Sequence, residues 1–304
     1  MKIAFLGLGD IGKPMAHHIV ASAHSLVVWN RTAEKAREFA ASHAGVVVAP
    51  SPAEAVTDCD VVITCLPSSV EVEELLHRSD GMLANLKRGS ILLDCTSGDP
   101  ETSRDISAEL APRGVEFVDA PVSGGTIAAI EARLTVMCGG STEAFARVKP
   151  VIEIFGKKIV YCGRVGAGHT VKAVNQALLA VHILATAEAL VAAAKAGVNP
   201  AVALDVINAS SGRSNSSENL IPARALTREF PRTFRLALLD KDVDIAARLT
   251  KRVGVEAPII ELAARLTSEA HKLLGEEVDH VEAVRMVEVR GGAEIKNYQP
   301  GTRD

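Results

Sequence analysis

Three glycines near the start of the chain constrain its fold more than any other feature of the sequence. Gly7, Gly9 and Gly12 stand in G-x-G-x-x-G spacing, directly after an apolar run and directly before a helical pattern. In that order, the first permits a tight turn, the second lets a ligand approach the backbone, and the third lets the helix pack on the strand. The free N–H groups at the helix start favour phosphate, so we expect a dinucleotide site rather than a ligand-free turn. The residues expected to line it are Gly7, Leu8, Gly9, Asp10, Ile11 and Gly12.

The first half of the chain alternates short strand-like runs with segments of helix length. Strands separated by helices at this spacing predict a doubly wound, mainly parallel sheet of the Rossmann type. The expected strands are Lys2–Leu6, Ser25–Trp29, Val46–Val48, Val61–Cys65, Ser90–Asp94, Glu116–Asp119 and Leu134–Cys138. The expected helices between them include Gly12–Ala23, Ala33–Ser42 and Thr102–Pro112.

The strand pattern stops after about Gly163. The run from His169 to Ala196 is helical in pattern and contains neither proline nor glycine, and further helical segments follow. We therefore expect an α/β dinucleotide-binding domain over residues 1–164 and an all-α domain for substrate binding and oligomerisation over residues 165–304.

The end of the second expected strand selects between the two nicotinamide dinucleotides. In NAD enzymes of this fold an acidic residue there accepts hydrogen bonds from the ribose 2′-OH. Here the strand is followed by Asn30, Arg31 and Thr32, none of which is acidic. Arg31 can pair with a 2′-phosphate, and Asn30 and Thr32 can hydrogen-bond it. We therefore expect NADP(H) to be preferred, with NAD(H) possible; the alternative is a solvated Arg31 that stacks on the adenine.

Two loops at later strand ends are candidates for the ribose and nicotinamide part of the site. Ligands of such sheets bind at the carboxyl ends of the strands. One loop is the turn that runs from Leu66 and Pro67 to Glu71, and the other contains Thr96. Taken alone, each would be an ordinary loop.

A further segment after a strand carries polar groups that a core would not favour. Ser123, Gly124 and Gly125 can present a hydroxyl and successive backbone N–H groups to a small anion such as a carboxylate. A Pro/Gly turn without a ligand is the alternative.

The helical segment that begins near Gly168 has polar side chains on one face. Lys172, Asn175 and Gln176 are spaced i, i+3 and i+4, so they are neighbours on a helix. Three polar groups on a largely apolar helix are costly to bury unless they form hydrogen bonds or take part in binding or catalysis. A lysine there can act as a general acid that protonates a carbonyl oxygen as hydride reaches the carbon. The alternative is an exposed lysine with two polar neighbours on the solvent side.

Charge and composition exclude several classes of protein. A net charge of −4 with scattered Lys and Arg does not indicate a basic surface that would bind nucleic acid or an anionic membrane. The nine histidines show no metal-ligand spacing, and G-x-S-x-G is absent, so we expect no metal and no serine hydrolase. Five cysteines without a C-x-x-C pair are typical of free thiols in a reducing compartment, and we expect a cytoplasmic protein. The most apolar stretch, Ala177–Ala194, contains a histidine and a glutamate, which favours a buried helix over a membrane span.

Taken together, these segments resemble the 3-hydroxyisobutyrate dehydrogenase family. This family of short-chain β-hydroxyacid dehydrogenases includes tartronate semialdehyde reductases and glyoxylate/succinic semialdehyde reductases. The resemblance covers nearly the whole chain and rests on four signatures in order. They are Phe5–Ala16 with Ile11 where Met is usual, Asp119–Gly125, Gly166–Gly168 followed by Lys172 and Asn175, and Phe234 followed by Lys241–Ala246.

The resemblance implies a role for each of the predicted residues. Lys172 would be the catalytic acid/base, Asn175 would orient it or the substrate, and Ser123–Gly125 would hold the substrate carboxylate. Lys241 would approach the cofactor from the second domain, and Thr96 with the Leu66–Pro67 turn would line the nicotinamide side. The resemblance also implies a homodimer or homotetramer that uses no metal.

One departure from the family pattern concerns the substrate side of the predicted site. Some members place a second asparagine directly after the position of Asn175, whereas this chain has Gln176. In this respect the chain resembles the semialdehyde-reductase branch.

The predicted activity is hydride transfer between NADP(H) and a small 3-hydroxy acid/semialdehyde pair, with a carboxylate-bearing aldehyde or hydroxy acid as substrate. An imine reductase is one alternative, although those enzymes generally lack a lysine at the position of Lys172 and the Ser-Gly-Gly segment. A non-catalytic NADP(H) sensor is another, and it predicts cofactor binding without turnover.

Overall fold

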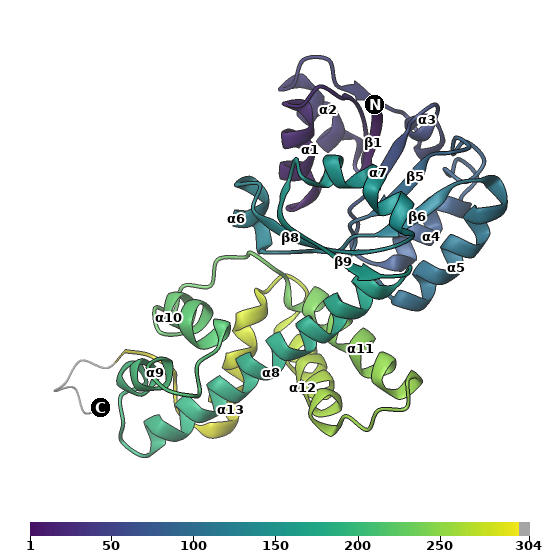
Figure 1. Cartoon of the computed structure of the whole chain (residues 1–304). Coiled ribbons are helices and arrows are strands. Elements are labelled where there is room, and N and C mark those ends of the chain that lie inside the picture. Colours follow the sequence, from purple (N-terminus) through teal and green to yellow (C-terminus); the bar gives the residue numbers. More distant parts are fainter. Residues whose placement is uncertain (298–304) are drawn as a thin grey trace. The chain divides into compact units, whose positions relative to one another are not determined.

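The computed structural model describes residues 1–297 and divides into two compact units. The first unit is Met1–Lys172, and the second begins at Ala173 (Figure 1). The boundary therefore lies a few residues beyond the predicted one, inside the long helix α8, Ala167–Lys195. The first turn of α8 belongs to the first unit because a buried carboxylate of that unit binds its backbone, as described below.

The first unit contains the doubly wound, mainly parallel sheet that the sequence predicts. The strand order is β3-β2-β1-β4-β5-β6-β8-β7, and β9 pairs with β8. Neighbours from β3 through to β6 run parallel, as do β8 and β9, whereas β6 and β7 pair antiparallel with β8. The strands are β1 Lys2–Leu6, β2 Ser25–Trp29, β3 Val47–Val48, β4 Val61–Thr64, β5 Ile91–Asp94, β6 Glu116–Asp119, β7 Val122–Ser123, β8 Leu134–Gly139 and β9 Gly156–Gly163.

Helices lie on both faces of this sheet (Figure 1). Alternate strand residues supply the two cores: Ile3 and Phe5 pack with α1, α2 and α7 on one face, whereas Ala4 and Leu6 pack with α3, α4 and α5 on the other. This two-sided burial explains why the parallel strands are almost continuously apolar. The helices of this unit are α1 Gly12–Val20, α2 Ala33–Ala41, α3 Pro52–Val56, α4 Ser69–His77, α5 Pro100–Leu110, the 3₁₀ turn η1 Ala111–Arg113, α6 Gly125–Ile130 and α7 Thr142–Ile152.

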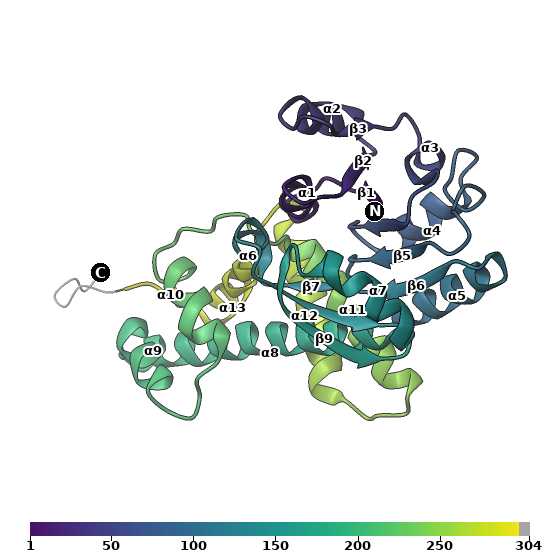
Figure 2. The same cartoon turned by 45° about the horizontal axis from the view of Figure 1, so that its top comes forward.

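Two strands, β7 and β9, were not among those predicted (Figure 2). β7 has two residues, too few for a periodic pattern. β9 begins with glycine and two exposed lysines, and most of its side chains are not buried. A strand with little burial lacks the alternation by which strands are recognised, so its pairing with β8 comes from the tertiary structure.

The second unit is helical, as predicted. Its elements are α9 Pro200–Asn208, the π-helical turn η2 Ser216–Leu220, α10 Ile221–Arg224, α11 Leu236–Arg252, α12 Pro258–Leu274, the 3₁₀ turn η3 His280–Ala283 and α13 Val284–Gly291, together with most of α8. One face of α8 enters the core of this unit through Ile183, Leu184 and Leu190, whereas Leu178 is exposed. Among the described helices α8 passes a length and composition test for a membrane span, a test that core helices of soluble proteins also pass; 39% of its most apolar window is buried.

Candidate dinucleotide and substrate site

The three glycines after β1 differ in what surrounds them. A Cβ on Gly7, whose φ is +106°, would lie 2.3 Å from the Cys65 carbonyl oxygen, and one on Gly12 would lie 2.0 Å from the Gly7 carbonyl oxygen. A Cβ on Gly9 would meet nothing within 4 Å. The fold itself therefore requires Gly7 and Gly12, whereas Gly9 leaves an open position at the start of α1. That open backbone beside a helix N-terminus fits a dinucleotide pyrophosphate.

The side chain of Asn30 joins the Gly-rich turn to the end of β2. The Leu8 N–H donates to Asn30 Oδ1 at 2.9 Å, and Asn30 Nδ2 donates to the Thr32 carbonyl oxygen at 2.9 Å. Arg31 is exposed and, within residues 1–297, makes no hydrogen bond or ion pair. The carboxamide of Asn30 thus shapes the loop, and the guanidinium of Arg31 remains available to a phosphate.

The two predicted loops after β4 and β5 are connected to each other. The Leu66 N–H donates to Thr96 Oγ1 at 3.1 Å, and the Thr96 N–H donates to Asp94 Oδ1 at 3.1 Å. Pro67 is exposed beside Leu66. Glu71 accepts a hydrogen bond from the Ser68 hydroxyl, which also caps the N-terminus of α4. The loops that were predicted to face the nicotinamide therefore share one hydrogen-bonded frame.

The Ser123–Gly125 segment is an open turn that leads from the last residue of β7 to the first residue of α6. Gly124 and Gly125 have φ values of +132° and +68°, a conformation that glycine adopts without strain. Both glycines are exposed, and a Cβ on Gly125 would meet nothing within 4 Å. In the part of the chain that the structure describes, the Ser123 hydroxyl has no hydrogen-bond partner. This geometry leaves the Ser123 hydroxyl and the backbone of the two exposed glycines open to a small anion.

Asp119 connects that segment to the helix that carries Lys172. Its fully buried carboxylate accepts the Gly166 N–H at 2.7 Å and the His169 N–H at 2.8 Å, and so caps the start of α8. Burial raises the pKa of the Asp119 carboxyl, against the opposing effect of His169 and these hydrogen bonds. Lys172, one turn further along α8, is buried with 8% of its surface exposed. The predicted catalytic lysine thus stands on a helix whose first turn is fixed by the residue that opens the Asp119–Gly125 segment.

Two glycines make room for this cap. A Cβ on Gly168 would lie 2.2 Å from the Met137 carbonyl oxygen and 2.8 Å from Asp119 Oδ2. A Cβ on Gly139 would lie 2.5 Å from Asp119 Oδ1. Larger residues at either position would displace the carboxylate or the helix start.

The predicted polar residues of the second unit form a chain of hydrogen bonds. Asn175 Nδ2 donates to Gln176 Oε1 at 3.3 Å, and Gln176 Nε2 donates to Asp242 Oδ2 at 3.0 Å. Lys241 Nζ lies 2.7 Å from Asp242 Oδ1. Asn175, Gln176 and Lys241 are thus brought together by the buried Asp242, to which the sequence reasoning had given no role.

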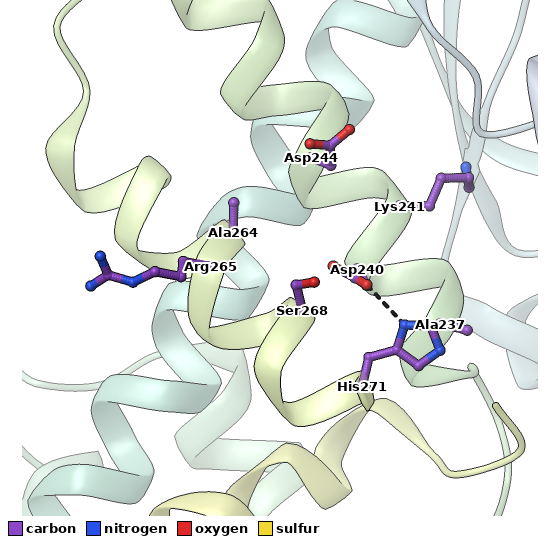
Figure 3. A pocket seen from close by; sticks show the side chains of 8 residues that line it. All are labelled: Ala237, Asp240, Lys241, Asp244, Ala264, Arg265, Ser268 and His271. Atoms are coloured by element: carbon purple, nitrogen blue, oxygen red, sulfur yellow. Dashed lines mark hydrogen bonds and ion pairs between the residues drawn. The ribbon is translucent and has the colours of Figure 1, made fainter. Parts of the chain in front are cut away.

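A hollow of about 510 Å³ lies beside Lys241 in the second unit (Figure 3). In it His271 Nδ1 lies 2.8 Å from Asp240 Oδ2, and the close view shows Lys241 pointing away from that pair. The lining combines two carboxylates with cationic side chains, so it selects no single charge. Its residues are Ala237, Asp240, Lys241, Asp244, Ala264, Arg265, Ser268 and His271.

Neither metal ligation nor disulfide chemistry is built into the described part of the chain. No group of three or more His, Cys, Asp or Glu side chains within residues 1–297 is arranged to hold a metal ion. All five cysteines are free. Burial raises the pKa of the Cys65 and Cys138 thiols to about 12, which keeps them protonated and unreactive at neutral pH.

Two family models match the chain, and together they span most of it. The NAD binding domain of 6-phosphogluconate dehydrogenase matches residues 2–163. The NAD-binding model of NADP-dependent 3-hydroxyisobutyrate dehydrogenase matches residues 166–287.

Similar proteins of known activity cover nearly the whole length of the chain. The mitochondrial 3-hydroxyisobutyrate dehydrogenase of Mus musculus is 36% identical over 277 residues, which are 89% of this chain and 80% of that protein. The 2-(hydroxymethyl)glutarate dehydrogenase of Eubacterium barkeri is 31% identical over 98% of this chain and 99% of its own. The structure of Mycobacterium tuberculosis 3-hydroxyisobutyrate dehydrogenase with L-serine superposes with a TM-score of 0.86 at 31% identity, over 94% of this chain and 98% of that one.

Proposed function

Because the chain belongs to the 3-hydroxyisobutyrate dehydrogenase family of NAD(P)-binding oxidoreductases, we propose that it interconverts a small 3-hydroxy acid and its semialdehyde. One observation carries the proposal. Asp119 links the open Ser123–Gly125 turn to the helix start that holds the buried Lys172. A buried lysine positioned in this way suits a proton donor better than a solvated surface residue.

NADP(H) is the proposed cofactor, with NAD(H) as the weaker alternative. The end of β2 offers the exposed Arg31 and no carboxylate at Asn30 or Thr32. A guanidinium matches the charge and the planar donor geometry that a 2′-phosphate requires. The family model over the second half describes NADP-dependent enzymes, which agrees with this preference.

In the proposed mechanism the chain's own residues bind, orient and protonate the substrate. The Ser123 hydroxyl and the N–H groups of Gly124 and Gly125 hold the substrate carboxylate. When bound, NADPH supplies a hydride to the carbonyl carbon. As the C–H bond forms and the carbonyl π bond breaks, Lys172 donates its proton to the carbonyl oxygen. This gives the alcohol and a neutral lysine, which solvent then reprotonates. In oxidation the same lysine accepts the hydroxyl proton.

Asn175 and Gln176 orient the substrate in this proposal. Gln176 is itself held by the buried Asp242, which also binds Lys241. Such anchoring fixes the amide groups and reduces the entropy lost when substrate binds.

The experiment compares wild type with Lys172→Ala on a panel of small semialdehydes and glyoxylate, with NADPH and NADH, and on hydroxy acids in reverse. We expect Lys172→Ala to keep its NADPH affinity and to lose about a hundredfold or more in kcat, as is usual for a missing general acid. Lys149→Ala, which removes an exposed lysine of α7, is the matched control and should retain wild-type kcat. Near-wild-type kcat in Lys172→Ala would exclude the mechanism.

Two other functions are distinguished by the same assay when cyclic imines are added to the panel. An imine reductase would reduce cyclic imines faster than any semialdehyde, and the presence of Lys172 and Ser123–Gly125 argues against it. An NADP(H) sensor would bind NADPH and turn over nothing. The hydrogen-bonded set around Asp242 favours catalysis, since mere cofactor storage has no need of it.

We also propose that the enzyme is a cytoplasmic homodimer or homotetramer. Apolar side chains are exposed on two consecutive helices of the second unit, with Leu178 on α8 at 54% and Val206 on α9 at 61%. A second copy of the chain could cover them. Light scattering after size exclusion should give twice or four times the chain mass, and Leu178→Glu should lower it; a monomeric wild type would refute the proposal. The free cysteines favour a reducing compartment.

A further inference from the structure

We propose that His169 is a positioning residue that ties the loop of Thr96 to the first turn of α8, and so holds Lys172 in register with the nicotinamide side of the site. The inference rests on the proposed function, because it takes Thr96 and Lys172 as parts of that site. His169 itself is completely buried and is placed to touch neither substrate nor cofactor.

Both ring nitrogens of His169 are used. Nε2 lies 2.8 Å from the Thr96 carbonyl oxygen, and Nδ1 lies 2.6 Å from the Ser103 hydroxyl. A carbonyl oxygen can only accept, so Nε2 carries a hydrogen and donates it. In the neutral ring Nδ1 then accepts from Ser103. The side chain therefore links α8 to the end of β5 and to α5 through directed hydrogen bonds.

The backbone of His169 adds a third, independent link. Its N–H donates to Asp119 Oδ2 at 2.8 Å, which fixes the helix start to the end of β6. The imidazole fixes the same turn to the neighbouring strand end. One residue thus joins the carboxyl ends of β5 and β6, the strand ends from which two of the predicted binding segments extend.

The buried ring is packed closely by the loop after β5. A Cβ on Gly98 would lie 3.1 Å from His169 Cε1 and 2.3 Å from Ser69 Oγ, so the loop after β5 closes tightly over the imidazole. Because a side chain enclosed in this way cannot readily change its conformation, a displacement of the loop would also displace the helix start.

The His169 link therefore affects both the nicotinamide-side loops and Lys172. Thr96 Oγ1 accepts the Leu66 N–H, so the carbonyl that His169 holds belongs to the frame of both nicotinamide-side loops. Lys172 follows His169 by one helical turn. Loss of the imidazole link would loosen these loops relative to the lysine, and small displacements between reacting groups cost rate steeply.

The test uses two substitutions of His169 that separate the ring nitrogens, together with one of Ser103. His169→Gln can still reach Thr96 with an amide N–H in place of Nε2, whereas the shorter His169→Asn can replace only Nδ1 and keeps the Ser103 contact. Ser103→Ala removes that contact and leaves Nε2 intact. We expect His169→Asn to lose about tenfold to a hundredfold in kcat with little change in KM for NADPH. We expect His169→Gln and Ser103→Ala to stay within about fivefold of wild type.

Two further readouts distinguish positioning from general destabilisation. With NADPH deuterated at the transferred hydrogen, the isotope effect on kcat should rise in His169→Asn, because poorer alignment makes hydride transfer limiting. Hydrogen exchange at the Leu66 and Thr96 amides, measured without substrate, should speed up in the same variant and not in His169→Gln. Equal kcat losses in His169→Asn and His169→Gln, or unchanged exchange in His169→Asn, would overturn the inference. An inactive wild type would refute the proposed function instead, and the exchange result would still decide the role of His169.

Discussion

Gly9→Ala is the substitution that best distinguishes what the fold requires from what dinucleotide binding requires. A Cβ at this position meets nothing within 4 Å, and Gly9 is not among the described glycines with positive φ. An alanine should therefore fit the ligand-free protein with a change in unfolding free energy below about 1 kcal/mol, in either direction. In the complex the methyl group would occupy the space through which the pyrophosphate approaches the backbone.

The loss of affinity follows from the contact that the methyl group would block. One hydrogen bond from a backbone N–H to a charged phosphate oxygen contributes about 1.5–3 kcal/mol. At about 1.4 kcal/mol for each factor of ten, the Kd for NADPH should rise about tenfold to a hundredfold. The assay is a fluorescence titration with NADPH, accompanied by thermal unfolding without it.

Gly12→Ala is the opposite control, because its Cβ would lie 2.0 Å from the Gly7 carbonyl oxygen. It should unfold at a clearly lower temperature even without cofactor. A Gly9→Ala variant that binds NADPH as tightly as wild type, or that is as unstable without ligand as Gly12→Ala, would contradict this prediction.

Three further predictions follow from single groups. Arg31→Ala should raise KM for NADPH about tenfold and leave KM for NADH unchanged in steady-state assays, since it removes one charged contact to the 2′-phosphate; equal effects on both would place Arg31 elsewhere. Cys95 and Cys138 should resist a thiol reagent in the native protein and react once it is denatured, because burial raises the pKa of both thiols, that of Cys138 to about 12; rapid labelling of either native thiol would contradict this. Burial opposes ionisation of Asp279, but its hydrogen bonds and His280 hold the carboxyl pKa far below its ordinary value. The carboxylate's contribution to stability is therefore complete above the pKa of the unfolded state, near 4, and is lost as pH falls through the pKa of the folded state. In urea titrations Asp279→Asn should lower the free energy of unfolding by about 2 kcal/mol at pH 7 and by less at pH 3. A loss that does not depend on pH would refute this prediction.

Most of the fold follows from local patterns in the sequence. The buried parallel strands are apolar runs bounded by turns, and α8 from His169 onward is a long segment without proline or glycine, so both were predicted to within a few residues. β9 was not, because its exposed residues lack the alternation of a half-buried strand and its place is decided by β8. The unit boundary shifted for a similar reason, since the helix start is held by Asp119, 47 residues before Gly166 in the chain.

The sequence predicted the motif residues of the candidate site but not the residues that position them. The G-x-G-x-x-G turn and the helix face of Lys172 have spacings that follow from local geometry. The residues that support the first turns of the α8 helix, His169 and Asp242, act through partners 73 and 66 residues distant in the chain. The only signal for either in the sequence is a polar residue at a buried helical position, a signal equally given by a satisfied core residue.

The residues of the predicted dinucleotide site divide by what surrounds them, and this division says more about ligand contacts than the motif match does. Gly7, Gly12 and Asn30 are each used by the protein itself, through close backbone contacts or through hydrogen bonds to Leu8 and Thr32. Gly9, in the turn after β1, has open space around its Cβ position, and Arg31, after β2, has no partner within the described residues. Substitutions of the first group should therefore affect stability and binding together, whereas substitutions of the second should affect binding alone. A motif match treats both groups alike, and only their surroundings separate the residues that build the turn from those available to the dinucleotide.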